Sequence, residues 1–203
     1  MSTYLGIDVL DQNTHNMRES IRHAFTRKGT LVGSGVGRKK WDDDAGQAIP
    51  GRPFTWTAKD RAEIGALLGF IDARRGRVKP FWTPTFGGEI PLAAAASSGA
   101  STIVIKFIGY TRSMFPVTAR RYLAVLRPAG TFFVVKVTGS ADNGNGTETL
   151  NLGSSLPEDV PVQRIVSYFA LCRLDAPTKV RWQNPFLAEA DFLFRELPLE
   201  VPA

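Results

Sequence analysis

The sequence holds few side chains of the kinds that catalyse reactions or bind metals. Its two histidines, His15 and His23, lie near the N-terminus, and Cys172 is the single cysteine. A zinc site needs several such ligands, and a nucleophilic triad needs a histidine beside a placed serine or cysteine. No GxSxG, HxxxH or CxxC pattern occurs. We therefore expect no metal, no cofactor and no catalytic centre, and we predict that the protein is not an enzyme.

Carboxylates and glycines leave two further kinds of site to consider. A carboxylate pair can cleave glycosidic bonds, but the candidates Glu158-Asp159 and Glu196-Glu200 lie near prolines at loop or strand ends, where solvated acids are common. The segment 142–146 lacks the terminal glutamate of a calcium loop, so it predicts a hairpin turn. No Lys-Ser/Thr pair follows the glycine run 33–37, so a phosphate loop is not expected there.

The chain carries 25 Lys and Arg against 19 Asp and Glu, a net charge of +6. A basic balance suits nucleic acid when the cations cluster. The dense patch at 74–79 (RRGRVK) coincides with an expected helix end, where cations favour the dipole, so capping is the preferred interpretation. The alternative is a nucleic-acid-binding β-barrel that uses this patch, with Phe81 and Trp82 stacking on bases.

One amphipathic helix is predicted over 58–75. Thr57 is a suitable N-cap, and Ile64, Leu67, Leu68 and Ile71 follow the i, i+3, i+4, i+7 spacing of a single apolar stripe. Gly76 is expected to end the helix. A shorter helix is indicated over 16–27, and residues 28–53 predict a loop or a weakly paired hairpin.

After Pro91 the pattern is that of strands separated by turn residues. Seven strands are predicted, at 101–110, 120–127, 131–137, 146–152, 162–173, 178–183 and 188–196. The expected fold is mainly β (α+β), a β-sandwich or barrel of about seven strands with one long amphipathic helix packed against it. We expect one core: residues 1–53 form an N-terminal arm and loop region, either part of the same domain or an assembly arm, and residues 54–203 form the β-sandwich with its helix. No apolar run approaches the roughly 20 residues of a membrane span.

Several blocks of the sequence resemble minor tail proteins of tailed bacteriophages. The run 56–84 joins a capped helix, Arg-Gly-Arg and a Phe-Trp-x-Pro strand, and blocks near 143–150, 171–175 and 194–198 are similar to later parts of such proteins. The resemblance covers about residues 54 to 198. It implies a virion component of the distal tail or tail-tip type, with a tail tube-like β-sandwich.

The resemblance also implies partners and a location. Such subunits form a ring, hexameric or else trimeric, that joins the tail tube protein to hub or tip proteins, with the tape measure protein as a further candidate neighbour. Assembly would take place in the host bacterial cytoplasm. A carbohydrate-binding tail domain is another alternative.

Side chains that are hard to place in a core are the candidates for contacts between subunits. They flank expected loops or proline-broken strands, or lie in the basic patch: Trp41, Phe54, Trp56, Arg75, Arg77, Phe81, Trp82 and Phe86. The aromatic members could instead cover the edge of the sheet. The glycine-rich segment 29–53 could become ordered when subunits join.

Overall fold

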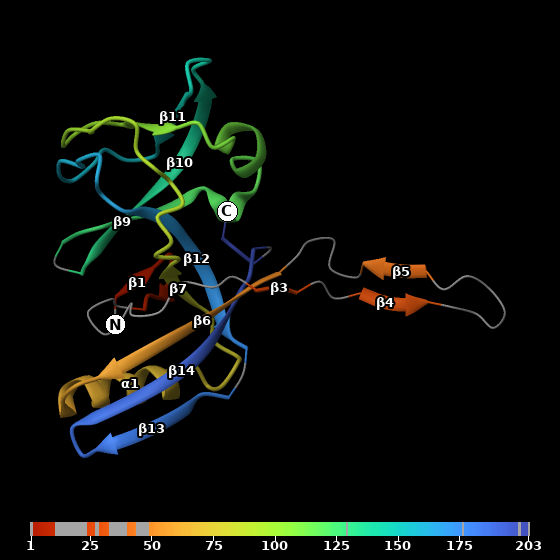
Figure 1. Ribbon diagram of the computed structural model, residues 1–203, viewed down its shortest axis with the longest axis vertical. Helices are drawn as coiled ribbons and strands as arrows, with labels where there is room; N and C mark the ends of the chain where they lie inside the picture. The colour runs from red at the N-terminus through yellow and green to blue at the C-terminus, as the bar shows by residue number, and fades with distance from the viewer. Residues whose placement is uncertain are drawn as a thin grey trace. The chain divides into compact units, whose positions relative to one another are not determined.

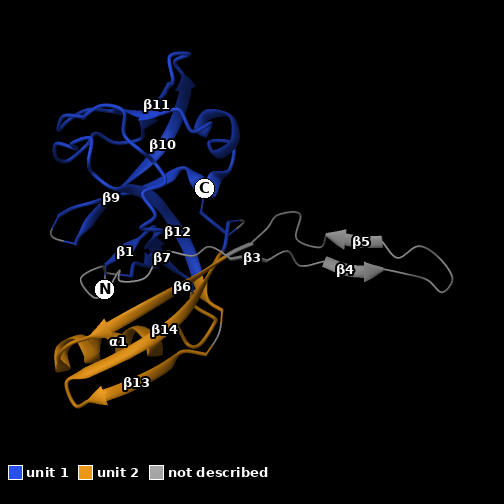
Figure 2. Cartoon of the chain, in the orientation of Figure 1, with its two compact units in different colours: residues 1–15, 80–172, 197–203 blue, residues 16–79, 173–196 orange. Residues whose placement is uncertain are grey.

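The computed structural model describes residues 2–10, 24–26, 29–32, 40–43, 49–128, 130–175, 177–198 and 200–202, with side chains described at 2–10 and from 51 onward. Within its described residues the protein is mainly β. It divides into two compact units (Figures 1 and 2). Unit 1 comprises Met1–His15, Pro80–Cys172 and Leu197–Ala203, and unit 2 comprises Asn16–Lys79 and Arg173–Glu196. The expectation of one core, with residues 1–53 as an arm and 54–203 as the domain, stays a prediction.

Unit 1 is built on an open antiparallel sheet. Its strands are β7 (Phe81–Pro84), β8 (Thr102–Lys106), β9 (Tyr122–Leu126), β10 (Phe132–Asp142), β11 (Thr147–Leu152) and β12 (Val166–Leu174), whose last two residues belong to unit 2. Strand β12 pairs with β7 and β9, β9 with β10, β10 with β11, and β11 with β8. A short N-terminal hairpin joins β1 (Thr3–Tyr4) and β2 (Ile7–Asp8). A π-helical turn, Tyr110–Met114, and a 3-10 turn, Thr118–Arg120, precede β9.

The centre of the unit 1 sheet is buried on both faces. Leu123 and Val125 of β9 belong to one apolar cluster, while Tyr122 and Ala124 belong to another. A strand that is covered on both faces has a continuous run of apolar residues, whereas a strand covered on one face alternates apolar and polar residues. Strand β9 has such a continuous run, YLAVL. The second cluster is covered in part by Val9, which follows the N-terminal hairpin.

The outer edge of β8 is covered by the chain that leads to it. Ala93 donates its N–H to the Val104 carbonyl at 2.9 Å, and Lys106 donates to the Pro91 carbonyl at 2.9 Å. Backbone groups that would otherwise face solvent are thereby paired, which removes a template for association.

Unit 2 combines an antiparallel sheet with the helix. Its sheet runs in the order β3 (Ala24–Thr26), β6 (Ile49–Ala58), β14 (Leu187–Glu196) and β13 (Lys179–Asn184). Strands β4 (Gly29–Val32) and β5 (Lys40–Asp43) form a separate two-stranded hairpin. Strand β6 runs unbroken through residues 53 and 54, so the expected boundary between arm and domain does not interrupt it.

Helix α1 (Arg61–Ala73) packs on β6 and β14 within unit 2. It begins later and ends earlier than predicted, because Asp60 rather than Thr57 is the N-cap and accepts a hydrogen bond from the Glu63 N–H at 2.8 Å. Its 13 residues do not make the long helix that the pattern predicted. The buried face also differs: Phe70 is 1% exposed, whereas Leu68 is 43% exposed. The cause is the partner surface, since Trp56 of β6 and Phe192 of β14 both contact the Phe70 ring.

All seven predicted strands are present, as β8 to β14. The hairpin alternative for residues 28–53 is met by β4 and β5. The helix predicted over 16–27 was wrong at its end, because Ala24–Thr26 forms strand β3 and pairs with β6; the rest lies outside the described residues. No sheet closes into a barrel among the described strands. Each sheet is open and has an edge strand at either end.

Candidate assembly surface

Most of the aromatic residues selected from the sequence lie in the cores of the units. Phe81 and Trp82 are 0% exposed, and Trp56 and Phe86 are nearly so. Strand β7, an expected edge segment, is buried at all four positions because it pairs with β12 and is covered by apolar side chains. The Trp82 ring stacks on Phe169 with centroids 5.0 Å apart.

The remaining candidates divide into aromatic and basic side chains. Phe54 is half-buried and stacks on Phe194 with centroids 4.9 Å apart in unit 2. Arg75 and Arg77 are exposed at the end of α1. The side chain of Trp41 lies outside the described ones. The interface role of these residues stays a prediction. Among the candidates whose side chains are described, Arg75 and Arg77 are the exposed ones.

The basic patch at 74–79 is smaller on the surface than in the sequence. Arg74 is 0% exposed, and its guanidinium lies 5.2 Å from the centre of the Phe70 ring, a cation–π geometry. Arg74 is therefore part of the unit 2 core. With Phe81 and Trp82 also buried, the stacking groups that the nucleic-acid hypothesis needs are not accessible while the units stay folded.

A buried carboxylate in unit 1 fixes an exposed turn. Glu148 of β11 is 0% exposed and accepts hydrogen bonds from the N–H groups of Ile108, Tyr110 and Thr111, at 3.0, 3.0 and 2.7 Å. Burial alone would raise the pKa of Glu148, but these main-chain donors more than offset it, so the pKa is lowered. The turn that this carboxylate holds presents Phe107, 54% exposed.

A second buried carboxylate lies in unit 2. Glu196, at the end of β14, is 4% exposed and lies 3.2 Å from the Nε atom of Arg52 on β6. Both side chains are almost fully removed from solvent, so the pair joins the two strands from inside the unit. These two carboxylates serve structure: each is committed to groups of the chain itself.

Among the described side chains of unit 2, the most exposed aromatic ones lie at the edge of its sheet. Trp182 of β13 is 55% exposed, and Phe186, in the turn to β14, is 57% exposed. Arg61 of α1 lies 5.3 Å from the centre of the Phe186 ring. Strand β13 pairs with β14 along one edge, and no described strand pairs with the other. Such an open edge can take a further strand.

The two faces of β13 differ in chemistry. Val180 and Trp182 lie opposite Ala190 and Ala188, which are both 0% exposed. Since directly opposite residues of a sheet share a face, Trp182 lies on the buried face of unit 2, at the last described strand of its sheet. We call the exposed β13 edge, with Val180, Trp182 and Phe186, the β13 surface.

The opposite face of the β13 edge is charged and solvated. Lys179 and Arg181 lie opposite Asp191 and Glu189 of β14, and Arg181 forms an ion pair with Asp191. Thr55 of β6 donates a hydrogen bond to Asp191 at 3.0 Å. Charged residues on an edge strand usually prevent it from pairing with other chains. The half-exposed Trp182 on the other face indicates that preventing such pairing is not the only role of this edge.

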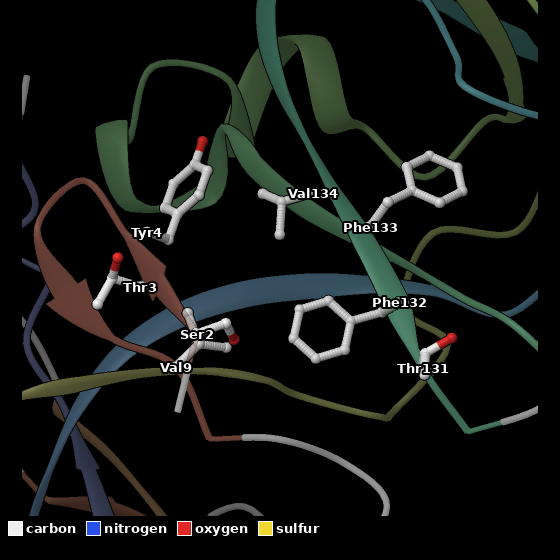
Figure 3. Close-up of a pocket in the computed structure, with 8 residues that line it drawn as sticks. All are labelled: Ser2, Thr3, Tyr4, Val9, Thr131, Phe132, Phe133 and Val134. Atoms are coloured by element: carbon white, nitrogen blue, oxygen red, sulfur yellow. The ribbon is translucent and has the colours of Figure 1, made fainter.

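Unit 1 carries two shallow grooves. One, of about 400 Å³, lies between the N-terminal hairpin and the start of β10 (Figure 3). There Phe132 and Val134 point toward the hairpin and Phe133 points away. Among the residues that line this groove, Tyr4 is the titratable one. Burial and the neighbouring Tyr122 raise the pKa of Tyr4. The other groove, of about 480 Å³, lies beside the β9–β10 turn; its lining residues are Leu126, Arg127, Pro128, Pro161, Gln163, Arg164 and Ile165.

Within the described part of the chain, no group of three or more His, Cys, Asp or Glu side chains could hold a metal ion. Helix α1 is the longest described helix, and no helix there is long and apolar enough to cross a bilayer. No protein-family model matches the sequence, and a search of curated proteins finds no match.

The sequence interpretation did not select Trp182 or Phe186. A signal was present: the strand 179–184 (KVRWQN) has two cations and two amides among six residues, a composition typical of an edge strand. An aromatic residue on an edge strand has no second neighbour to cover it. That reasoning would have favoured Trp182 over Trp82 as a surface group.

Proposed function

We propose that this chain is a structural virion subunit at the distal end of a phage tail, with a tail tube-like β-sandwich and helix. It forms a ring that joins the tail tube to the tip or hub. The proposal combines the resemblance of residues 54 to 198 with one feature of the molecule, the β13 surface. A subunit of this kind acts through surfaces that join protein to protein, and the β13 surface has the composition of such a contact.

The argument from the β13 surface is energetic. An exposed tryptophan and phenylalanine beside an open strand edge leave apolar area in water that a neighbour could cover, at about 25 cal/mol per Å². Tryptophan and arginine are enriched among residues that dominate the energy of interfaces, and β13 carries both. A ring contact is heterologous, so a subunit must offer two different surfaces, of which β13 supplies one.

The direct test is assembly. The full chain should sediment as a closed oligomer, alone or with a purified tail tube protein, and negative-stain images should show rings. Antibody against the chain should label the tip end of the parent particle. A chain that stays monomeric with the tube protein and is missing from the particle would contradict the proposal.

Carbohydrate binding is the second candidate, and the same exposed aromatic pair favours it. Trp182 is followed by Gln183 and Asn184, and an aromatic ring beside amides is suited to sugar rings and their hydroxyls. A glycan array separates the two functions. Binding that Trp182→Ala abolishes, in a chain that forms no ring, would favour a carbohydrate-binding domain.

A further inference from the structure

The groove beside the β9–β10 turn of unit 1 has two walls that the chain itself holds in place. One wall is formed by residues 126–128, and the other by the turn before β12. In that turn the Arg164 N–H donates to the Pro161 carbonyl at 2.9 Å. The Leu126 N–H donates to the Ile165 carbonyl at 3.0 Å and so joins the two walls. The groove is therefore formed before any ligand binds.

Two arginines line this groove, and they differ in what they bind. The Nε atom of Arg127 lies 2.9 Å from a Glu158 carboxylate oxygen, and its guanidinium lies 5.3 Å from the centre of the Phe133 ring. Arg164 has no such partner among the described residues, and its Nε atom is removed from solvent without a hydrogen bond. A buried donor of this kind normally has an acceptor. Arg164 therefore retains an unmet demand for one.

The remainder of the groove is mainly apolar and continues beyond its lining residues. Ile165 is 46% exposed, and Val162, which stands between the lining residues Pro161 and Gln163, is 40% exposed. Apolar area left in water in this way stabilises a complex when a ligand covers it. Because the apolar surface extends past the groove, an extended chain covers more of it than a small molecule does. The Gln163 amide can pair with a peptide group of such a chain.

We propose that this groove binds an extended segment of a partner protein in which an aspartate or glutamate stands close to an apolar residue. The carboxylate pairs with the Arg164 guanidinium, and the apolar side chain covers Ile165. The charges are complementary, since two of the described lining residues are arginines and none is acidic. Hydrogen bonds between a guanidinium and a carboxylate are strong and directional.

The binding groove is independent of the proposed function. It belongs to unit 1, whereas the tail subunit proposal rests on the β13 surface of unit 2. Either proposal can fail while the other stands.

Phosphate is the other anion that a guanidinium binds well, so nucleic acid is the competing ligand. Single-stranded nucleic acid is held by aromatic rings that stack on its bases. None of the described residues that line the groove is aromatic, and most of the lining is apolar. A protein segment is therefore the better match. Binding of an oligothymidylate that Arg164→Gln abolishes would overturn the assignment to a protein segment.

The test is a titration of the full, isotope-labelled chain with unlabelled peptides, followed by NMR. The probes are capped octapeptides of glycine and serine that hold one glutamate and two leucines, with the glutamate at every spacing from the leucines. At least one should bind with a Kd below about 1 mM and shift the backbone signals of Gln163 and Ile165. The Nε–H signal of Arg164 should shift as well. A panel in which no peptide moves these signals would overturn the proposal.

Matched peptides test the two halves of the proposed ligand. Replacing the glutamate of the best probe by glutamine should weaken binding at least about fivefold, because the charge-assisted hydrogen bonds are lost. Replacing its leucines by serine should also weaken binding, because the apolar cover is lost. A glutamine peptide that binds as tightly as the glutamate peptide would contradict the role given to Arg164.

Matched variants of the protein test the same contacts from the other side. Arg164→Gln should weaken binding of the glutamate peptide at least about fivefold and remove the preference for glutamate over glutamine. Arg164→Lys keeps the charge and should keep that preference, with weaker binding. Arg112→Gln, at an exposed position of unit 1 outside the groove, should change neither.

The apolar contact has its own control within unit 1. Ile165→Ser should weaken binding, whereas Ile108→Ser, at a residue that is 38% exposed and does not line the groove, should not. Thermal unfolding of each variant checks that the fold is kept. Equal losses from Ile165→Ser and Ile108→Ser, or from Arg164→Gln and Arg112→Gln, would show that the peptide binds elsewhere and would overturn the proposal.

Discussion

Strands β7 and β13 are both short and each carries a tryptophan, yet the two side chains have opposite environments. Trp82 of β7 is 0% exposed, whereas Trp182 of β13 is 55% exposed. The proline-rich sequence FWTP looked like an edge segment and KVRWQN like an ordinary strand of the sheet. The difference shows that residue type alone does not decide whether a tryptophan is buried. The elements that cover its strand decide it.

The covering elements can be named for β7. Tyr4 of the N-terminal hairpin meets the Trp82 ring edge-on with centroids 5.7 Å apart, and Phe169 of β12 stacks on its face. Strand β13 has β14 along one edge and no described strand along the other. The outer edges of two strands show the same contrast. Residues 91–93 pair with the outer edge of β8 in unit 1, whereas the outer edge of β13 in unit 2 has no described partner.

The largest effect is expected from truncating the buried member of the pair. Trp82→Ala should lower the free energy of unfolding by about 4 kcal/mol, because it removes a fully packed ring and leaves a cavity among Tyr4, Tyr122 and Phe169. Urea unfolding followed by circular dichroism measures this. A loss below about 1 kcal/mol would mean that β7 is not a core strand.

The interior of unit 2 can be tested through its buried ion pair. Arg52→Met should cost about 3 kcal/mol, because it takes the guanidinium away from the buried Glu196 carboxylate. The double variant Arg52→Met with Glu196→Leu should recover much of that loss, since it removes both charges of the pair and leaves neither one buried alone. If the double variant is less stable than the single one, the carboxylate is held by groups other than Arg52.

The fixed turn of unit 1 should show a smaller and pH-dependent effect. Glu148→Gln should cost about 2 kcal/mol near neutral pH, because an amide cannot accept hydrogen bonds from three N–H groups as a carboxylate does. The folded pKa of Glu148 is lowered below its usual value of 4.5, so the stabilisation is present above pH 4.5 and is lost as pH falls through the folded pKa. The stabilities of the wild-type chain and the Glu148→Gln variant should therefore converge in acid. Parallel pH profiles would show that Glu148 does not carry this stabilisation.

These effects also show where the sequence was sufficient. The seven strands after Pro91 were predictable because alternation and turn residues are local signals. The buried face of α1 was not, because Trp56 and Phe192 decide that Phe70 faces inward, and they come from strands on either side of it in the chain. The division into two units was equally hidden, since unit 2 combines residues before 80 with residues after 172. The β13 surface required knowing which strand ends the sheet.

The smallest effect on stability is expected at Trp182, where the comparison began. Trp182→Thr should change the free energy of unfolding by about 0.5 kcal/mol, because half of the ring is already in water and threonine suits an edge strand. A loss as large as that of Trp82→Ala would mean that the ring belongs to the unit 2 core and is no free surface. Conserved stability together with weaker association would separate the two tryptophans by role: one holds a unit together, and the other is available to join it to a neighbour.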